Sequence, residues 1–586
     1  MKHRLSLLFI LSLAICSFAG TACQQNAATV TAPAPVAHLQ VPPSALEEDV
    51  DLSCSYFYFL WGRHAELRLQ FDEALEAYEK AFICDPNAEE ASEKIPILML
   101  RLERTTEAKL WLQNYLSQHP DNVNLRMLYA RVLLSQQDTE QAMLQYQIIS
   151  KNHPNDPAIM LPLAEMYLSK HETAKTREIL DQILTQDPNS YQGNILMARF
   201  LRTTDDPLAA LNYYQKALAA NWSAEIQGEE AELLAQGKDY SQAERLYRDI
   251  LDKEEQNESA SLGLVRLYLL QNKDDKALEE LYSLREISEN QAWVDLAIAR
   301  LYVKQQKYAK AKELAEKIVR QNGLTEARFL LAALLKQEKN YQAALRQVRL
   351  IDHKAPEFLD ALSLHIDILT ELNRVDDAIL LLERNIANSV TRHPAMYRLL
   401  ADLHDSQGRS SMARKVFEQG LVLYPENEDL RYTYGLYLES KGENDAALQE
   451  MEKIIAINPD NAAALNYVGY SWADANTNLP EALQYLQKAV ALTPENGYIR
   501  DSLGWVYYRL GKWDDALLEL EKANAIIPND PAILDHLAEV YMTSGNTEKA
   551  LPLYKTLLRL YIDSKNETAE QNTLNIIHQL EQAPSP

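Results

Sequence analysis

Glycine is scarce in this chain, with 16 occurrences in 586 residues. Nucleotide-binding loops and the tight turns of β-hairpins depend on glycine, because it adopts positive φ without steric cost. The chain also has no P-loop, no G-x-S-x-G motif, no H-E-x-x-H motif and no C-x-x-C pair. No pair of its 12 histidines has metal-ligand spacing with a carboxylate partner. These absences predict a protein that is not an enzyme and that binds no cofactor or metal.

Basic residues are outnumbered: Lys and Arg total 58, Asp and Glu total 84, and the formal net charge is −26. A surface of this sign repels phosphate backbones, and no long basic run offsets it, so the composition argues against nucleic-acid binding. Apolar residues make up 47% of the chain, which is too many for a disordered protein. Low glycine with abundant Ala, Leu, Glu and Gln predicts an all-helical protein with a substantial core.

The N-terminus has the features of a secretory signal peptide. A basic start, Met1–Arg4, precedes an apolar run over residues 5–18 and small residues up to Ala22. The run is shorter than the roughly 20 residues that span a bilayer, which predicts a signal peptide over 1–22. Gly20-Thr21-Ala22-Cys23 resembles the bacterial lipobox, with Gly where Leu is usual. We therefore expect Cys23 to be acylated; the alternative is an ordinary cleaved signal and a soluble periplasmic product.

The residue after the expected acylation site refines the predicted location. It is Gln24 and not Asp, which by resemblance to bacterial lipoproteins implies the outer membrane, with the protein facing the periplasm. Residues 23–54 are rich in Ala, Pro, Thr and Val and show no helical period, so we interpret them as a flexible tether.

Prolines recur with a period of about 34 residues. Pro86, Pro120, Pro154 and Pro188 are each 34 apart, and the spacing returns between 425 and 528 with steps of 34 or 35. Alanine lies twelve residues before most of these prolines, and it keeps the period where proline is absent. Examples are Ala74, Ala108, Ala142, Ala210, Ala243, Ala277, Ala311, Ala344, Ala378, Ala413, Ala447, Ala482, Ala516 and Ala550. Such a period predicts an array of helical repeats.

The clearest unit spans residues 498–528 and is read as two helices joined by a turn at Gly511. Small residues at Gly504 and Ala516 would let the helices approach closely, and Pro528 would stop the second helix. The pattern of large residue, Leu-Gly, Tyr, Ala, large residue, Ala and Pro resembles the tetratricopeptide repeat (TPR). The same pattern recurs over 428–459, 462–494 and 531–560.

This resemblance implies an all-α TPR solenoid of about 15 antiparallel helix pairs in a right-handed superhelix. The predicted boundaries are repeats 1–5 over 55–222, degenerate repeats 6–10 over 223–392, repeats 11–15 over 393–560, and a capping helix and tail over 561–586. The repeats use nearly all of the chain, so no length remains for a catalytic domain.

Two cysteines remain after export, Cys54 and Cys84. Cys54 lies at the start of the first helix of repeat 1 and Cys84 at the end of the second. Because the helices are antiparallel, both cysteines lie at the same end of the hairpin. A disulfide can persist in an oxidising compartment, so we predict a bond between them; the alternative is two free buried thiols.

The family resemblance also implies that the first helix of each repeat lines a concave groove. The C-terminal part of this groove is predicted to be acidic and aromatic, and a basic partner segment would complement it. The alternative for the aromatic residues of this groove is that they pack between neighbouring repeats. The predicted partner-binding residues are Tyr432, Asn466, Tyr470, Tyr498, Asp501, Trp505, Tyr508, Asp535 and Glu539. The carboxylate clamp of chaperone-binding TPRs is not expected, because Asn466 alone matches it.

These features predict a non-enzymatic scaffold or adaptor at the bacterial envelope that binds an extended or helical segment of a partner protein. The chain resembles TPR lipoproteins that serve periplasmic carboxyl-terminal-processing proteases, and also those of envelope polysaccharide export. The alternative is a glycan- or peptidoglycan-binding module. Groove aromatics in one open line would favour sugar, whereas aromatics in pockets beside acids would favour peptide.

Overall fold

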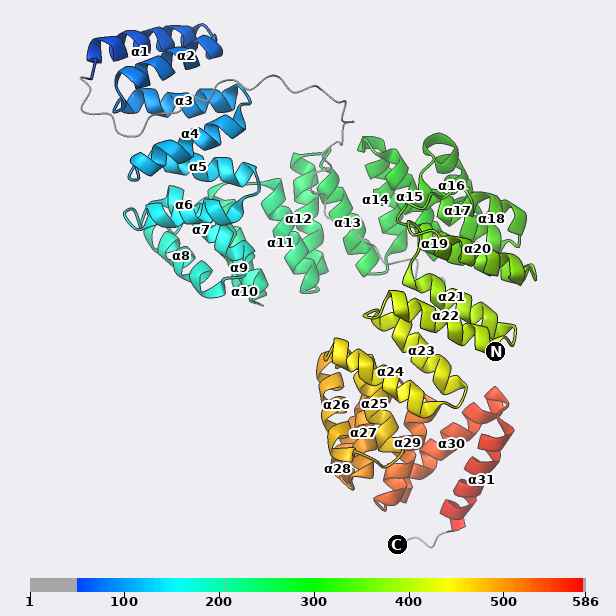
Figure 1. The fold of residues 1–586 in the computed structure, drawn as a ribbon. Helices are drawn as coiled ribbons and strands as arrows, with labels where there is room; N and C mark the ends of the chain where they lie inside the picture. The colour runs from blue at the N-terminus through cyan, green and yellow to red at the C-terminus, as the bar shows by residue number, and fades with distance from the viewer. Residues whose placement is uncertain (1–49, 205, 583–586) are drawn as a thin grey trace. The chain divides into compact units, whose positions relative to one another are not determined.

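The computed structural model describes residues 50–204 and 206–582, and every regular element in these ranges is an α-helix (Figure 1). The predicted signal peptide, Cys23 and most of the predicted tether lie outside the described residues. Among the helices that are described, none combines the length and the apolarity needed to cross a bilayer.

Thirty of the described helices form fifteen consecutive pairs, in which we call the odd-numbered helix A and the even-numbered helix B. The chain divides into two compact units, Met1–Leu314 and Ala315–Pro586. The first contains α1 (Leu52–Leu67), α2 (Phe71–Cys84), α3 (Glu89–Arg101), α4 (Thr105–Gln118), α5 (Val123–Ser135), α6 (Thr139–Ser150), α7 (Pro157–Ser169), α8 (Thr173–Gln186), α9 (Tyr191–Thr203), α10 (Pro207–Ala220), α11 (Ala224–Gln236), α12 (Tyr240–Lys253), α13 (Glu258–Leu270), α14 (Asp274–Ile287) and α15 (Gln291–Lys304).

The boundary between the units falls within α16 (Tyr308–Asn322). The second unit continues with α17 (Thr325–Gln337), α18 (Tyr341–Val348), α19 (Phe358–Glu371), α20 (Val375–Ala387), α21 (Pro394–Ser406), α22 (Ser410–Leu423), α23 (Glu428–Ser440), α24 (Asn444–Ile457), α25 (Ala462–Asp474), α26 (Leu479–Leu492), α27 (Gly497–Arg509), α28 (Trp513–Ile526), α29 (Pro531–Thr543), α30 (Thr547–Ser564) and α31 (Glu567–Gln582). The predicted all-α array of helix pairs is thus confirmed.

The repeat proline and the residue two positions after it set the boundary between repeats. Asn122 follows Pro120, and its side chain accepts a hydrogen bond from the Leu125 backbone N–H at the start of α5. Asn427 and Asn461 cap α23 and α25 in the same way. The proline therefore ends one B helix, and the capping residue begins the next A helix.

Except between α9 and α10, where residue 205 lies outside the described ranges, each turn between an A and a B helix contains a residue with positive φ, and the turn before α26 contains two, Asn476 and Asn478. In the C-terminal repeats the residue with positive φ is usually glycine, as at Gly511, where φ is 72°. In the N-terminal repeats it is a residue with a side chain, as at Leu69, where φ is 62°. The same position is occupied by Glu103, Gln137, His171, Lys238, Asn272, Gln306, Lys339, Asn373, Gly408, Gly442, Asn476 and Gly545.

The periodic alanines lie at the contact between the two helices of a pair, and in repeat 4 the equally buried Thr176 takes their place. Ala74, Ala311 and Ala516 have no exposed surface, and the other alanines of the series are equally buried. At the facing position of repeat 14, a Cβ atom on Gly504 would lie 2.5 Å from Cγ of Leu520. The close approach that the small residues predict is therefore confirmed.

The degenerate repeats keep their helix pairs with one irregularity. Helix α18 has only eight residues, where most B helices have fourteen. The chain leaves α18 after Val348, buries Ile351 and reaches Pro356 just before α19. Pro356 keeps the repeat position twelve residues after Ala344, as Pro86 does after Ala74 in repeat 1, where α2 has fourteen residues, so the proline does not by itself shorten α18.

The two ends of the array are built differently. At the first end, the structure joins Cys54 of α1 to Cys84 of α2 in a disulfide, with Cα atoms 5.8 Å apart. That separation lies within the range that a disulfide spans. At the other end, α31 packs on α30 and buries Thr573 and Ile577.

Candidate functional site

The A helices of neighbouring repeats contact one another in the second unit. Helix α21 packs beside α23, α25 beside α27, and α27 beside α29. All nine predicted binding residues lie on four of these helices. Tyr432 is on α23; Asn466 and Tyr470 are on α25; Tyr498, Asp501, Trp505 and Tyr508 are on α27; Asp535 and Glu539 are on α29. We call the surface of α23, α25, α27 and α29 the A-helix face.

Trp505 does not present its ring to solvent, because only 6% of its surface is exposed. Its ring stacks on the imidazole of His536 with a centroid distance of 4.2 Å, and it lies 5.0 Å from the ring of Tyr508. The indole N–H has no hydrogen-bond partner among the described residues. The expectation that Trp505 contacts a partner directly is therefore wrong: the ring fills the space between α27 and α29.

Asp501 is also buried, and it forms an internal ion pair. Nδ1 of His536 lies 3.0 Å from the Asp501 carboxylate. Burial of the imidazole lowers its pKa, but the hydrogen bond to Asp501 and the charges of Asp501, Asp535 and Glu539 outweigh this effect, so the pKa of His536 is raised. Asp501 thus joins α27 to α29 and is not open to a partner, contrary to the expectation.

Tyr508 and Glu539 form a second link between these helices. The Tyr508 hydroxyl donates to Oε1 of Glu539 at 3.0 Å and lies 3.2 Å from the Thr543 hydroxyl. Tyr508 is half-buried, and its desolvation together with the bond to Glu539 raises the pKa of the phenol. Both residues therefore serve the packing of α27 against α29, and only part of each is accessible.

Tyr498 and Asp535 are the most open of the predicted residues. Tyr498 is 54% exposed, and its hydroxyl donates to Asp530 at 3.2 Å. The Asp535 side chain is exposed, yet loss of hydration among the surrounding helices raises its pKa despite the nearby His536. These two side chains are available to a partner.

The other three predicted residues are half-buried. Tyr432 packs against the cluster around Met451 and Ile454. Tyr470 packs near Trp505, and desolvation with the charges of Asp474 and Asp501 raises the pKa of its phenol. Oδ1 of Asn466 is buried and has no hydrogen-bond partner among the described residues.

Further acids lie on the same row of A helices. Asp474 on α25 and Glu439 on α23 are exposed. Burial and the hydrogen bond to Glu439 raise the pKa of Tyr467 to about 12. On α21, desolvation raises the pKa of Asp402, which is also exposed to solvent. Asp402 on α21 and Asp535 on α29 are thus accessible carboxylates whose pKa is raised by desolvation.

Two basic residues on A helices of the middle repeats, Arg266 and Lys336, are paired with acids of neighbouring repeats. Arg266 lies 3.1 Å from Glu232 in the first unit. In the second unit, Lys336 lies 3.2 Å from Asp367 and 3.5 Å from Glu371. These ion pairs link successive A helices and leave little free positive charge there. Nowhere in residues 50–204 and 206–582 do three His, Cys, Asp or Glu side chains gather as a metal site would require.

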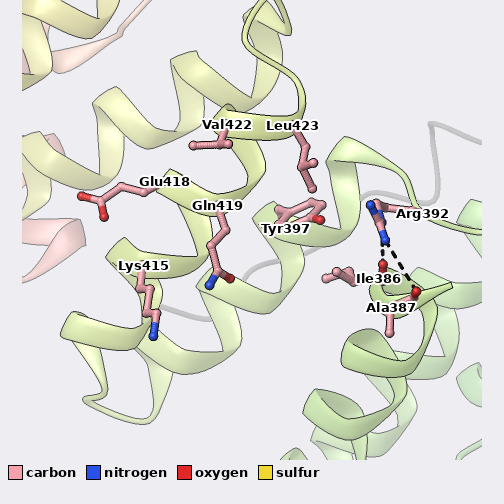
Figure 2. A pocket seen from close by; sticks show the side chains of 9 residues that line it. All are labelled: Ile386, Ala387, Arg392, Tyr397, Lys415, Glu418, Gln419, Val422 and Leu423. Carbon is pink, nitrogen blue, oxygen red and sulfur yellow. Dashed lines mark hydrogen bonds between the residues drawn. The ribbon is translucent and has the colours of Figure 1, made fainter. Parts of the chain in front are cut away.

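A pocket of about 500 Å³ lies elsewhere in the second unit, where the end of α20 meets α21 and α22 (Figure 2). Nε of Arg392 donates to the Ile386 carbonyl oxygen at 2.6 Å, which fixes the loop at its rim. Val422 is 80% exposed at its edge. The lining residues are Ile386, Ala387, Arg392, Tyr397, Lys415, Glu418, Gln419, Val422 and Leu423.

Sequence reasoning missed this pocket. The available signal was the run Leu421–Tyr424 before Pro425, since four consecutive large apolar residues exceed what one helix face can bury. The pocket needs the end of α20 as well, which belongs to the preceding repeat. A search within single repeats could not find it.

Models of the tetratricopeptide repeat match this chain in several places. One matches residues 99–159, 233–293 and 475–535. A second matches 296–357, 398–462 and 432–497, and a third matches 533–568. The matches cover the repeats on both sides of the degenerate region and much of that region itself.

Similar proteins are found among curated sequences and solved structures. The TPR repeat-containing protein PA4667 of Pseudomonas aeruginosa is 30% identical over 190 residues, a third (32%) of each chain. A chain of the Naa15/Naa10 complex bound to HypK-THB is 12% identical, with 90% of this chain and 98% of that chain covered and a TM-score of 0.37. A chain of the APC/C hetero-tetramer Cut9-Hcn1 is 14% identical, with 83% of this chain and 96% of that chain covered and a TM-score of 0.32. MamA is 21% identical, with 30% of this chain and 94% of that chain covered and a TM-score of 0.26.

Proposed function

Because this chain belongs to the tetratricopeptide repeat family, whose members typically act as non-enzymatic protein-binding scaffolds, we propose that it is an adaptor that holds a basic segment of a partner protein. The proposed binding surface is the row of A helices from α21 to α29. The partner segment is extended or helical, so that it can follow several successive repeats.

The observation that carries this proposal is the state of the carboxylates on these helices. Asp402 and Asp535 are accessible, but desolvation raises the pKa of each. A positively charged side chain placed beside them would restore the stabilisation that lost hydration removes. A Lys or Arg segment therefore gains more from this surface than a neutral or acidic segment does.

The aromatic residues favour protein over glycan as the ligand. A sugar platform needs aromatic faces that are open and in line. Here the Trp505 ring is covered by His536, and the Tyr508 hydroxyl is held by Glu539. Tyr498 alone among the predicted aromatics is more than half exposed. This arrangement supports a peptide-binding surface over the glycan-binding alternative.

We place the adaptor at the cell envelope, as an outer-membrane lipoprotein that faces the periplasm and is acylated at Cys23. The support comes from the basic start, the apolar run and the small residues before Cys23. The disulfide between Cys54 and Cys84 agrees with an oxidising compartment. Assembly of a periplasmic carboxyl-terminal-processing protease, or of an export complex, is the role that this location and fold suit.

The test neutralises accessible acids on the A helices. The variant combines Asp402→Asn, Asp474→Asn and Asp535→Asn, and the control combines Asp445→Asn, Asp514→Asn and Asp515→Asn on the exposed surfaces of B helices α24 and α28. Both lose three negative charges. Crosslinking in living cells followed by mass spectrometry identifies the partner for each.

We expect the A-helix variant to lose most of the partner that the unmodified chain recovers, and the control to keep it. Equal recovery by both variants would rule out the row of A helices from α21 to α29 as the binding surface. Loss from both would show that net charge, and not this surface, determines binding. Circular dichroism of both variants verifies that the helices remain.

A further inference from the structure

The first helix of the array has an exposed apolar face. Leu52, Tyr56, Phe57, Leu60 and Trp61 of α1 have exposed fractions of 54%, 66%, 57%, 64% and 51%. Their spacing of three, four and five residues places them side by side along one side of the helix. We call these five residues the α1 face.

The α1 face has the composition of an interior surface. Helices α3, α5 and α7 each pack against the B helix of the preceding repeat. Helix α1 begins at Leu52, and no described helix precedes it. Its outer side therefore carries the kind of residue that the rest of the array covers with a neighbour.

Contacts with α2 and between neighbouring rings hold side chains of the α1 face in place. Nε1 of Trp61 donates to Oε1 of Glu73 at 3.0 Å, and the rings of Phe57 and Trp61 lie 6.1 Å apart. The Cys54–Cys84 disulfide joins α1 to α2 beside the face. A preordered surface loses little conformational entropy when it is covered.

We propose that the α1 face is the interface of a homodimer, in which the α1 helices of two copies pack against each other. Residues 52–62 contain no charged side chain, although the whole chain has a net charge of −26. Two copies of so acidic a chain repel each other, and at this uncharged segment they can approach with little repulsion.

The polar outer side of α31, at the C-terminal end of the array, favours a closed dimer over a filament. A head-to-tail contact would place the α1 face of one copy on the outer side of α31 of the next. That side presents Gln571, Asn572, Asn575, His578 and Gln579, which are exposed and polar. The α1 face therefore finds a matching apolar surface in the α1 face of another copy and not on α31, and an interface between two α1 faces closes with twofold symmetry.

The exposed area is sufficient for a specific contact. With about 200 Å² for a fully exposed large side chain, the five residues leave roughly 600 Å² per copy. Two copies would bury about 1,200 Å², which is the lower limit for stable interfaces. The aromatic content matches that of interface centres, where Tyr, Trp and Phe are enriched.

The test uses the chain from residue 24 onward, which keeps every described residue and omits the predicted lipid. Sedimentation across a range of concentrations should give twice the monomer mass. Phe57→Glu and Leu60→Glu should each raise the dissociation constant about tenfold or more. In a twofold-symmetric interface, the new carboxylate of one copy lies near the same carboxylate of the other copy. The matched controls Leu518→Glu and Trp513→Glu change residues of similar exposure on α28 and should leave the mass unchanged.

A photo-crosslinker at position 60 identifies what covers the α1 face. A crosslink between two copies supports the proposal, and the same probe at position 518 should give none. A monomer at every concentration would overturn it, as would a dimer that both α1 variants preserve. Crosslinking of position 60 to residues 24–49 of the same chain, or binding of the unmodified chain to phosphatidylethanolamine vesicles without self-association, would also overturn it.

Discussion

The first repeat, α1 and α2, and the last, α29 and α30, end the helix array in different ways. The first is closed covalently by the Cys54–Cys84 disulfide and keeps its outer side apolar. The last is covered by α31, which buries Ile577 and turns polar residues outward. The turns differ as well: repeat 1 uses Leu69 at positive φ where repeat 15 uses Gly545.

This difference shows that one repeat pattern can be stabilised by two routes. In the last repeat, Gly545 adopts the positive φ of the turn without strain, and α31 covers the outer apolar side. In the first, the disulfide offsets a strained turn and an uncovered side. Because each hairpin contacts mainly its neighbours, these effects remain local to each end.

The largest expected effect comes from removing the disulfide. Cys54→Ser should lower the local stability of α1 and α2 by about 2–4 kcal/mol, because the unfolded hairpin is no longer constrained. Amide hydrogen exchange should show faster exchange in residues 52–84 and unchanged exchange in 531–582. Uniformly faster exchange along the chain would contradict the local view of the array.

The second effect tests helix packing in both regions. Ala516→Leu should cost about 1–3 kcal/mol, because the added atoms meet the close contact of α27 with α28. Ala74→Leu changes the equivalent buried position of repeat 1 and should cost less, because α1 is free to shift outward. Thermal unfolding of the two variants gives the comparison. No loss in either would mean that these alanines do not set the helix separation.

The third effect exchanges the turn residues. Leu69→Gly should stabilise repeat 1 by about 1 kcal/mol, because a leucine with φ of 62° is strained and glycine is not. Gly545→Leu should destabilise repeat 15 by a similar amount. Hydrogen exchange next to each turn measures both changes, and changes of the same sign would refute the explanation.

The smallest expected effect is a dependence of folding stability on pH, which the C-terminal repeats should show and the first repeat should not. The pKa of His536 is raised in the folded protein above its unfolded value of about 6.5. Its contribution to stability is therefore complete below that value, and it is lost as the pH rises through the folded pKa. His536→Gln should remove this dependence in unfolding measured between pH 6 and 9, while residues 52–84 show none of it in either protein.

Much of the fold could be predicted because its determinants repeat. The spacing of alanines and prolines placed the helix pairs, and Gly504 and Gly511 occupy the close contact and the turn that the pattern assigns to them. The short α18 was not predicted, since the alanine period continues through Ala344 and the break comes only after Val348.

The binding surface was predicted less well, because it depends on contacts between repeats. The pattern places Trp505 and Asp501 on the open side of an A helix, but both turn toward His536, about one repeat later in the chain. A periodic pattern shows which side of a helix a residue occupies. It does not show which residue of the next helix is large enough, or of the right charge, to cover it.

The polar outer side of α31 also limits how such a chain can lengthen. A further hairpin added after residue 582 would meet Gln571, Asn575 and His578, and it would find no apolar surface on which to fold. A duplicated hairpin inserted between two interior repeats would meet the surfaces that its neighbours already offer. Growth of this protein by duplication is thus disfavoured after α31, and so is an engineered extension at that helix.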